Sequence, residues 1–149
     1  MRRGERTWCG RLVVVNRPIR LLLVDDDDYD TMDLYRAVEQ TGIPIEWRAV
    51  HSAEEADAWR KGGYLPDLIV VDNGLPGMQG DQFAGIVLSD PLWCSPEGLR
   101  PLVVRYTGQD DPKGDTVIRK PPSAELVKTI LLAAQLLSVL ATMAGTVGG

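Results

Sequence analysis

The chain has little of the residue types that build transition-metal sites and disulfide frameworks. Its 149 residues include one histidine, His51, and two cysteines, Cys9 and Cys94. The two cysteines could form a disulfide, but nothing in their spacing supports one, and they match no metal-binding pattern. We therefore expect free thiols in a reducing cytoplasm, because cytosolic disulfides are rare. His51 is interpreted as an ordinary residue at a helix entry.

Positive charge and long apolar runs are also scarce. The net charge is −5, which argues against a protein that binds the phosphate backbone of nucleic acids. The apolar run Leu12–Val15 is too short for a signal peptide or a membrane span. The uncharged segment after Lys128 barely reaches the length of a span, and it contains Gln135 and Ser138. We expect a cytoplasmic protein without nucleic-acid or membrane partners.

The length of the chain suits one domain, which would bury roughly 68–70% of its unfolded surface. Hydrophobic residues make up 44% and charged residues 25% of the sequence, as in ordinary soluble proteins. We expect the domain to cover residues 18–141, with an N-terminal arm, 1–17, outside its core and a flexible C-terminal tail, 142–149. The first residues could instead form an extra edge strand, or lie upstream of a true translation start near Val15.

Apolar runs alternate with segments of helical periodicity, which indicates parallel βαβ units. The predicted strands are Arg20–Val24, Ile45–Val50, Leu68–Val71, Leu102–Tyr106 and Thr116–Arg119. The predicted helices cover residues 29–40, 52–59, 80–89 and 123–141. This pattern predicts an α/β protein with a doubly wound, five-stranded parallel sheet, in which ligands bind beyond the carboxyl ends of the strands.

Polar residues follow four of these strands at the point where each one ends. They are Asp25 with Asp26, Asp72, Thr107 and Lys120. Taken singly, an aspartate after a strand is more often a turn former or a helix cap, and a lone threonine or lysine there means little. Together, they predict one site, because the carboxyl ends of parallel strands meet in one crevice.

The residue types in this set suit phosphoryl chemistry. Carboxylates about 4 Å apart repel by roughly 4 kcal/mol per pair at an effective dielectric of 20, so either one is protonated or a divalent cation lies among them. Oxygen ligands favour Mg²⁺. The cation and Lys120 would neutralise charge on phosphoryl oxygens, and Thr107 would donate a hydrogen bond. Asp72 would be the nucleophile that forms an aspartyl phosphate.

At this point the chain resembles a response-regulator receiver domain of two-component signalling, the CheY-like family. The resemblance extends from Ile19 to about Leu132 and implies a flavodoxin-like strand order, 2-1-3-4-5. Four motifs carry it in the family's order: VDDD at Val24–Asp27, VDNGLPGMQG at Val71–Gly80, YTG at Tyr106–Gly108 and RKPP at Arg119–Pro122.

The resemblance implies a role for each residue of the predicted site. Asp72 corresponds to the phosphoacceptor. Asp26 would bind Mg²⁺ directly and Asp25 mainly through water, and the Gly74 carbonyl would be the third protein ligand. Thr107 corresponds to the switch hydroxyl. Lys120 corresponds to the lysine that contacts the phosphoryl group, and its bond to the next residue, a proline, is expected to be cis.

Two features depart from the family pattern. Only twelve residues separate Thr107 from Lys120, which leaves Gly108–Asp115 for the family's fourth helix. Two glycines and a central proline in that stretch predict a loop instead. The second departure is Val117, where the family usually carries a switch aromatic; Tyr106 is a nearby candidate for that role.

We therefore expect a stand-alone receiver that accepts a phosphoryl group from a histidine kinase or a phosphotransfer protein. It would catalyse only its own phosphorylation and dephosphorylation, and it would signal through protein–protein contact. Two alternatives stay open. One is a Mg²⁺-dependent aspartyl-phosphate hydrolase that acts on a small ester. The other is a pseudo-receiver that keeps the fold as an unphosphorylated docking module.

The predicted last helix carries more apolar residues than one buried face needs. One stripe should pack on the sheet: Leu126, Ile130, Ala133, Leu137 and Leu140. A second stripe would be left uncovered in a monomer: Leu132, Leu136, Val139 and Met143. The second stripe is either incidental surface leucine or the contact surface of a homodimer or another partner.

Overall fold

The computed structural model describes residues 17–95, 98–108 and 117–148. Its centre is a sheet of five parallel strands in the order β2-β1-β3-β4-β5, which confirms the predicted fold class and strand order. The strands are β1 (Ile19–Val24), β2 (Ile45–Val50), β3 (Leu68–Asp72), β4 (Leu102–Thr107) and β5 (Val117–Arg119).

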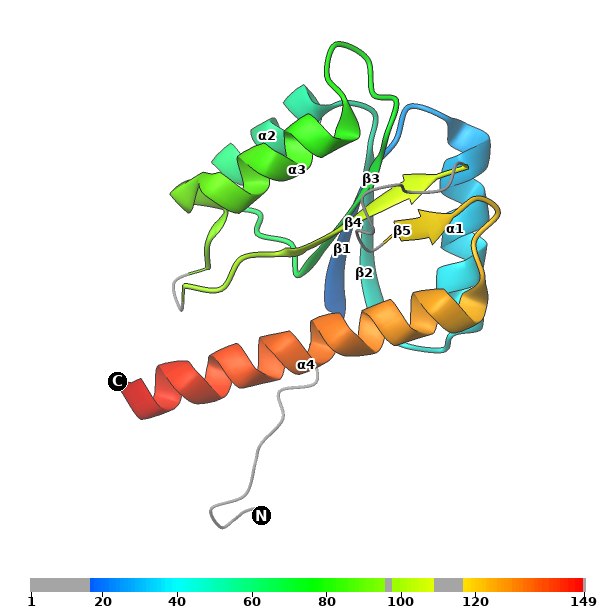
Figure 1. Ribbon diagram of the computed structural model, residues 1–149. Coiled ribbons are helices and arrows are strands. Elements are labelled where there is room, and N and C mark those ends of the chain that lie inside the picture. Colours follow the sequence, from blue (N-terminus) through cyan, green and yellow to red (C-terminus); the bar gives the residue numbers. More distant parts are fainter. Residues whose placement is uncertain (1–16, 96–97, 109–116, 149) are drawn as a thin grey trace.

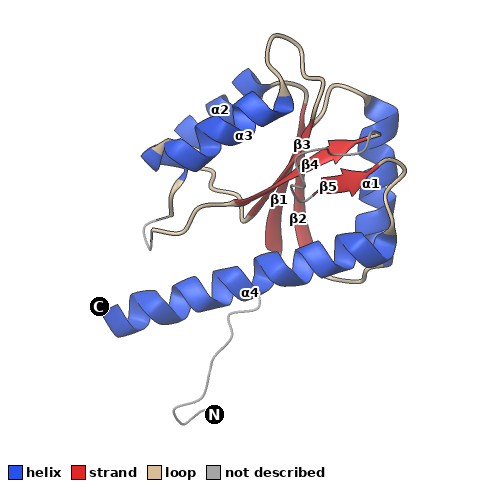
Figure 2. Ribbon diagram, viewed as in Figure 1, coloured by secondary structure: helices blue, strands red, loops and turns tan. Residues whose placement is uncertain are grey.

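Helices cover both faces of the sheet (Figures 1 and 2). Helices α1 (Asp28–Gln40) and α4 (Ala124–Gly148) pack on one face. Helices α2 (Ala53–Lys61) and α3 (Gly80–Ser89) pack on the other, followed by a short 3₁₀ turn, Pro91–Trp93. The chain thus forms three layers, with the two central strands β1 and β3 buried on both sides.

The central strands are apolar throughout because each face of the sheet has its own core. In β1, Leu21 and Leu23 belong to the core beneath α1 and α4. Leu22 and Val24 belong to the core beneath α2 and α3. The first polar residue after β1, Asp25, therefore comes where the strand leaves the core, and it sits at the edge where ligands bind in such sheets.

The turn between β3 and α3 is fixed by a close approach at Gly80. The Gly80 amide donates to the Asn73 carbonyl over 2.9 Å, which holds the start of α3 against the end of β3. A Cβ atom at Gly80 would overlap the Asp72 carbonyl oxygen and lie 3.0 Å from the Asn73 Cα. Only glycine fits there, so this residue sets the course of the loop that follows Asp72.

Helix α4 corrects two sequence predictions. It continues to Gly148, beyond the predicted end at residue 141, since no proline interrupts the helix after residue 122. Its buried face is also different: Ile130 is buried as predicted, but the other members of the predicted stripe are exposed. The residues that pack on the sheet are Val127, Ile130, Leu131 and Ala134.

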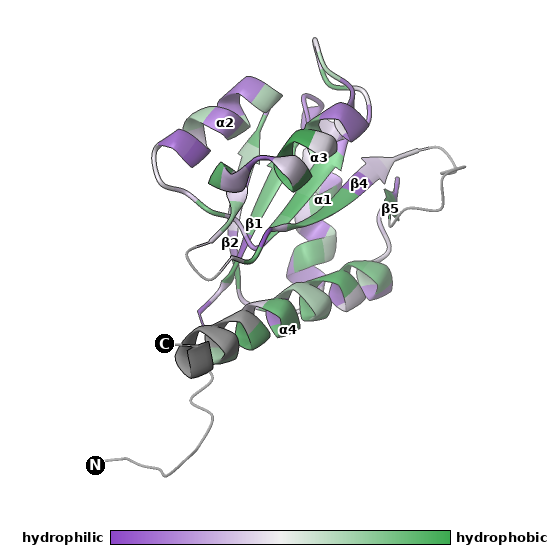
Figure 3. Ribbon diagram, turned by 60° about the vertical axis from the view of Figure 1, so that its left-hand side comes forward, coloured by the Kyte–Doolittle hydropathy of each residue, from purple (hydrophilic) through white to green (hydrophobic). Residues whose placement is uncertain are grey.

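The reason for the second error is that apolar residues lie all around this helix. Periodicity finds an apolar stripe, but it cannot say which of several stripes faces the sheet. Three members of the second stripe, Leu132, Leu136 and Met143, are exposed as predicted, whereas Val139 is half-buried. Figure 3 shows α4 hydrophobic along much of its length.

Several predictions fall wholly or partly outside the described residues. These include the arm 1–16, with Cys9 and the suggested translation start, and residues 109–116 of the predicted loop, with the predicted strand start at Thr116.

Arg17, placed in the arm by the sequence, is bonded to the domain: its guanidinium contacts Asp67 at 2.7 and 2.8 Å and the Ser138 hydroxyl at 3.2 Å. Cys94 is a free thiol.

Among the described residues, no helix has both the length and the apolar character that crossing a bilayer requires.

Replacing Gly80 by alanine should destabilise the fold by about 1–3 kcal/mol, as overpacking does. The matched control is Gly85→Ala on the same helix, where an added Cβ meets nothing within 4 Å. The control should raise stability by up to about 1 kcal/mol through helix propensity. Urea unfolding of both variants measures the difference, and equal stabilities would contradict the close approach at Gly80.

Candidate functional site

The sheet register brings the predicted residues to one edge. Val24 of β1 pairs with Val71 of β3, so Asp25 and Asp72 leave neighbouring strands at the same level. Asp72 pairs in turn with Tyr106 of β4, and Thr107 pairs with Arg119 of β5, the residue before Lys120. The four strand ends therefore form one row, as the sequence predicts for parallel strands.

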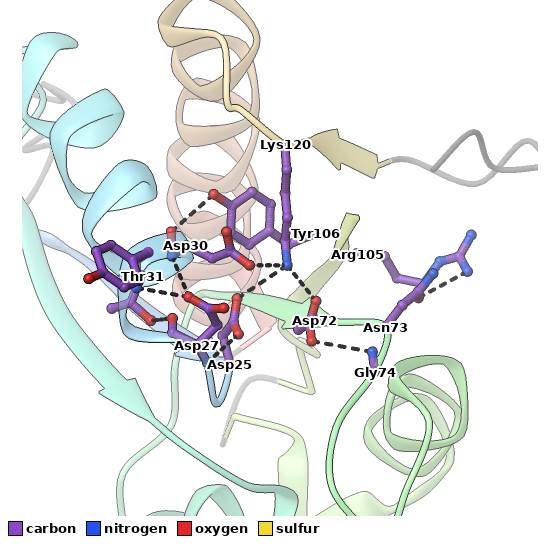
Figure 4. A network of polar contacts seen from close by, with 11 residues as sticks. Asp25, Asp27, Asp30, Thr31, Asp72, Asn73, Gly74, Arg105, Tyr106 and Lys120 are labelled. Carbon is purple, nitrogen blue, oxygen red and sulfur yellow. Dashed lines mark hydrogen bonds and ion pairs between the residues drawn. The ribbon is translucent and has the colours of Figure 1, made fainter. Parts of the chain in front are cut away.

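The Lys120 ammonium group is the centre of this site (Figure 4). Its Nζ atom lies 2.7 Å from Asp72 Oδ1 and 2.6 Å from Asp30 Oδ2. Asp25 Oδ2 is farther away, at 3.7 Å. The same ammonium lies 4.8 Å from the centre of the Tyr106 ring. One cation thus joins carboxylates from β3, α1 and the end of β1.

Asp30 is a site residue that the sequence analysis missed. It lies in the first turn of α1, beyond the four strand ends that the analysis considered. Asp27 begins this helix by accepting hydrogen bonds from the backbone amides of Tyr29 and Asp30. The acidic run that starts at Asp25 could have indicated this residue. A helix that begins directly after β1 places its first turn near the same crevice.

Tyr106 is completely buried on the α1 and α4 side of the sheet. Its hydroxyl donates a hydrogen bond of 3.0 Å to the Asp30 carbonyl oxygen. The ring therefore lies beneath the Lys120 ammonium, and its hydroxyl is bonded to the helix that carries the second carboxylate. Val117, the position of the family's usual switch aromatic, is only partly buried.

Asp25 is the most buried carboxylate of the site, with 1% of its surface exposed. Its Oδ1 accepts a hydrogen bond from the Asp27 amide at 2.9 Å, whereas Oδ2 has no hydrogen-bond partner among the described residues. Burial raises its pKa to about 6, and the negative charges of Asp72 and Asp30 act in the same direction. The Asp27 amide and the Lys120 ammonium oppose this shift only in part.

The pKa of Lys120 is shifted above its ordinary value by the surrounding carboxylates. Burial acts to lower it, but the hydrogen bonds to Asp30 and Asp72 and the charge of Asp25 outweigh burial. Lys120 is therefore a fixed positive charge at neutral pH. Its side chain is 20% exposed, so the ammonium remains within reach of a group that enters the crevice.

Three carboxylates of the site are arranged as ligands of a divalent cation could be. Asp25, Asp26 and Asp72 each offer an oxygen, and these oxygens all lie within 4.8 Å of one another. Two oxygens bound to one octahedral Mg²⁺ at about 2.1 Å lie about 3.0 Å apart when adjacent and about 4.2 Å apart when opposite, so the carboxylates would draw closer together around the ion. Asp25 Oδ2 supports this fit, since it is buried, receives no hydrogen bond among the described residues and has only the more distant Lys120 ammonium as an ion-pair partner.

Gly74 and Thr107 lie at the margins of this group. The Gly74 amide donates to Asp72 Oδ2 over 3.3 Å, which places the loop after β3 against the carboxylate that Lys120 contacts. Thr107 is buried at the end of β4, and its carbonyl accepts a hydrogen bond from the Lys120 amide at 2.9 Å. The Lys120–Pro121 bond is cis, as the resemblance implies.

No protein-family model and no curated protein matches the sequence, but solved structures do. A protein assigned as a response regulator from Chloroflexus aurantiacus J-10-fl is 28% identical, over 78% of this chain and 99% of that one, with a TM-score of 0.61. The two-component response regulator from Cytophaga hutchinsonii is 22% identical over 80% and 98%, with a TM-score of 0.67. The chain has the fold of a response-regulator receiver domain.

A third receiver structure, the chemotaxis response regulator CheY4 of Vibrio cholerae, aligns over 79% of this chain and 99% of its own. Its TM-score is 0.61, but its identity is only 19%. The agreement therefore lies in the fold. In this receiver fold, the crevice at the carboxyl ends of β1, β3, β4 and β5 is occupied by the acidic cluster and Lys120.

Replacing Asp25 by asparagine should stabilise the metal-free protein. Because the pKa of Asp25 is about 6 when folded and 3.8 as a reference, its carboxylate destabilises the fold above pH 6. This cost disappears as the pH falls toward 4. At pH 8 the variant should gain about 2 kcal/mol, and at pH 4 less than about 1 kcal/mol.

Urea unfolding with a chelator present, at both pH values, tests this expectation. Asp28→Asn is the matched control, since the Asp28 side chain is 87% exposed and should change stability by only a few tenths of a kcal/mol. A variant at Asp25 that is less stable than the wild type at pH 8 would contradict the described electrostatics.

Proposed function

We propose that this chain is a phospho-accepting receiver that takes a phosphoryl group onto Asp72 from a histidine kinase or a phosphotransfer protein. One observation carries the proposal: Lys120 Nζ lies 2.7 Å from a carboxylate that also belongs to a three-aspartate cluster. A nucleophilic carboxylate beside a fixed cation and a cation-binding cluster suits phosphoryl transfer, which depends on positioning and charge neutralisation.

Asp25, Asp26 and Asp72, with the Gly74 carbonyl, would hold Mg²⁺. The ion, when bound, would supply positive charge to the phosphoryl oxygens and offset repulsion among the carboxylates. Asp26 is exposed and Asp25 is buried, so Asp26 would bind the ion on its solvent-facing side and Asp25 on its protein-facing side. The other roles belong to side chains of this chain.

In the proposed transfer, an Asp72 oxygen attacks the phosphorus of a phosphohistidine. The new P–O bond forms as the P–N bond breaks, and the imidazole of the donor leaves with the electron pair and takes up a proton. Lys120 would move its hydrogen bond from the attacking carboxylate to a phosphoryl oxygen. The Thr107 hydroxyl would donate to another phosphoryl oxygen, which follows from its place at the end of β4.

In this chain, Asp30 would link phosphorylation of Asp72 to a change in the first turn of α1. Lys120 is shared between Asp30 and Asp72 at nearly equal distances, 2.6 and 2.7 Å. A phosphoryl group on Asp72 would draw the ammonium toward itself and weaken the bond to Asp30 in α1. The first turn of α1 and the Tyr106 hydroxyl would respond, and a partner that prefers this arrangement would shift the population.

A small-ester hydrolase has less support. The solved structures that resemble this chain are response regulators and receiver domains, which are signalling proteins and not ester hydrolases. A pseudo-receiver also has less support, because an unphosphorylated docking module would not need Asp72, Lys120 and the acidic cluster to lie together.

Radiolabelled acetyl phosphate should label the wild-type protein in the presence of Mg²⁺, and a chelator should abolish the label. Asp72→Asn should remove it, because the amide is not a nucleophile for phosphorus. Asp33→Asn, which changes a half-exposed carboxylate on α1, should retain full labelling. Labelling of Asp72→Asn at the wild-type level would contradict the assignment of the phosphoacceptor.

Mg²⁺ should raise the melting temperature of the wild-type protein near pH 8, because it binds the folded state alone. Asp26→Asn should lose most of this increase while keeping the metal-free melting temperature within about 2 °C, since the Asp26 side chain is exposed. Differential scanning fluorimetry with a Mg²⁺ titration gives both quantities. Identical melting with and without the ion would favour the pseudo-receiver.

A further inference from the structure

A cavity lies at the amino-terminal edge of the sheet, opposite the crevice that holds Asp72. Its volume is about 120 Å³. It is lined by residues from the start of β1, from the segment before β3 and from the middle of α4, which Figure 1 shows passing the start of β1. Asp67 in its wall lies about 16 Å from Asp72 along the extended β3. The cavity is therefore separate from the candidate site.

Positive charge is concentrated in the wall of this cavity. Arg17, Arg20 and Arg100 line it, and Asp67 is the one carboxylate among its described lining residues. The whole chain, by contrast, has a net charge of −5. Because a guanidinium keeps its charge in proteins, the wall carries an excess of two positive charges.

Arg17 balances the charge of Asp67. Its guanidinium donates to both oxygens of this carboxylate, over 2.7 and 2.8 Å, and to the Ser138 hydroxyl over 3.2 Å. The Arg20 backbone amide donates to Asp67 Oδ2 over 2.9 Å. The pair shows that this wall already binds one carboxylate through both of its oxygens, the geometry that suits an arginine best.

The other two guanidiniums have no carboxylate partner among the described residues. Arg100 is held in place by Nη1, which donates to the Val87 and Asp90 carbonyl oxygens over 2.9 and 2.8 Å. Its Nε and Nη2 atoms remain as donors. The Arg20 side chain forms no hydrogen bond or ion pair with a described residue, and its cross-strand neighbour Glu46 is exposed. Both arginines are half-buried, where an unbalanced charge is costly.

Much of the remaining wall is apolar. Trp93 and Ala134 are buried and Leu102 is half-buried. An apolar wall with a few convergent polar groups is typical of a small-molecule site. A matching ligand would combine an anionic group with an apolar body. Since a cavity of about 150 Å³ holds benzene, the 120 Å³ here suit a body of a few carbon atoms and exclude a nucleotide.

We propose that this cavity binds a small organic monocarboxylate. Arg20 and Arg100 donate charge-assisted hydrogen bonds to the carboxylate, and Trp93 and Leu102 contact the alkyl body. The proposal is independent of phosphorylation, because the cavity is lined by no residue of the candidate site.

Titration of the ¹⁵N-labelled full chain with isovalerate, followed by NMR, tests the proposal. The ligand should shift the backbone amide signals of Asp67 and Leu102 and leave that of Gly74, beside Asp72, unchanged. The shifts should saturate with a Kd of about 1 mM, which is ordinary for a ligand of this size. Isovaleramide has the same shape without the charge, and it should bind at least about tenfold more weakly.

Two variants with the same change of charge locate the effect. Arg20→Met removes a guanidinium from the cavity but keeps an apolar stem, and it should weaken isovalerate binding by about tenfold or more. Arg36→Met is the control, because the Arg36 side chain lies on α1 and is 65% exposed. Its Kd should equal that of the wild type. The dispersion of the amide signals shows whether each variant is folded.

Each of the remaining outcomes contradicts the proposal. Absence of a saturable shift at about 20 mM isovalerate, well above the expected Kd, would exclude the site. Equal affinity for isovaleramide would show that charge has no part in binding. Equal weakening in Arg20→Met and Arg36→Met would show an effect of net charge alone. Inorganic phosphate that binds as tightly as isovalerate would identify a site for any small anion.

Discussion

The candidate site depends on one ammonium group held among aspartates at the edge of a parallel sheet. Lys120 contacts Asp72 and Asp30 directly and lies 3.7 Å from Asp25. The carboxylates would repel one another without it, and Asp25 is so buried that its pKa rises to about 6. Lys120 directly follows the short strand β5, so the position of this strand in the sheet determines where the ammonium lies.

The Lys120 ammonium would have two functions in this site. In the metal-free protein the ammonium offsets negative charge and is shared between β3 and α1. In the proposed phosphorylated protein it would leave Asp30 for the phosphoryl group, and α1 would lose a bond. Tyr106 connects β4 to α1 at the same site, since its ring lies beneath the Lys120 ammonium and its hydroxyl is bonded to the Asp30 carbonyl. This chain would thus use α1 and β4 together to respond to phosphorylation.

The fold and most of the site follow from local sequence features. Apolar runs that stop at a polar residue, as at Asp25 and Asp72, predict parallel strands and the row of strand ends, because the topology itself brings those ends together. Asp30 was missed because its role depends on the angle at which α1 leaves β1, which no strand-end argument contains. The buried face of α4 was mistaken because leucines surround the helix, and only the packing against the sheet selects Val127 and Leu131 over Leu126 and Leu137.

The most direct test of the central claim is a crystal structure grown with Mg²⁺ and beryllium fluoride, which imitates a phosphoryl group on a carboxylate. The account predicts the fluoride complex on Asp72, Mg²⁺ bound by Asp25, Asp26 and Asp72, and Lys120 Nζ within hydrogen-bond distance of a fluorine, no longer bonded to Asp30. Lys120 still bonded to Asp30 beside an unmodified Asp72, or the ion bound elsewhere, would contradict it.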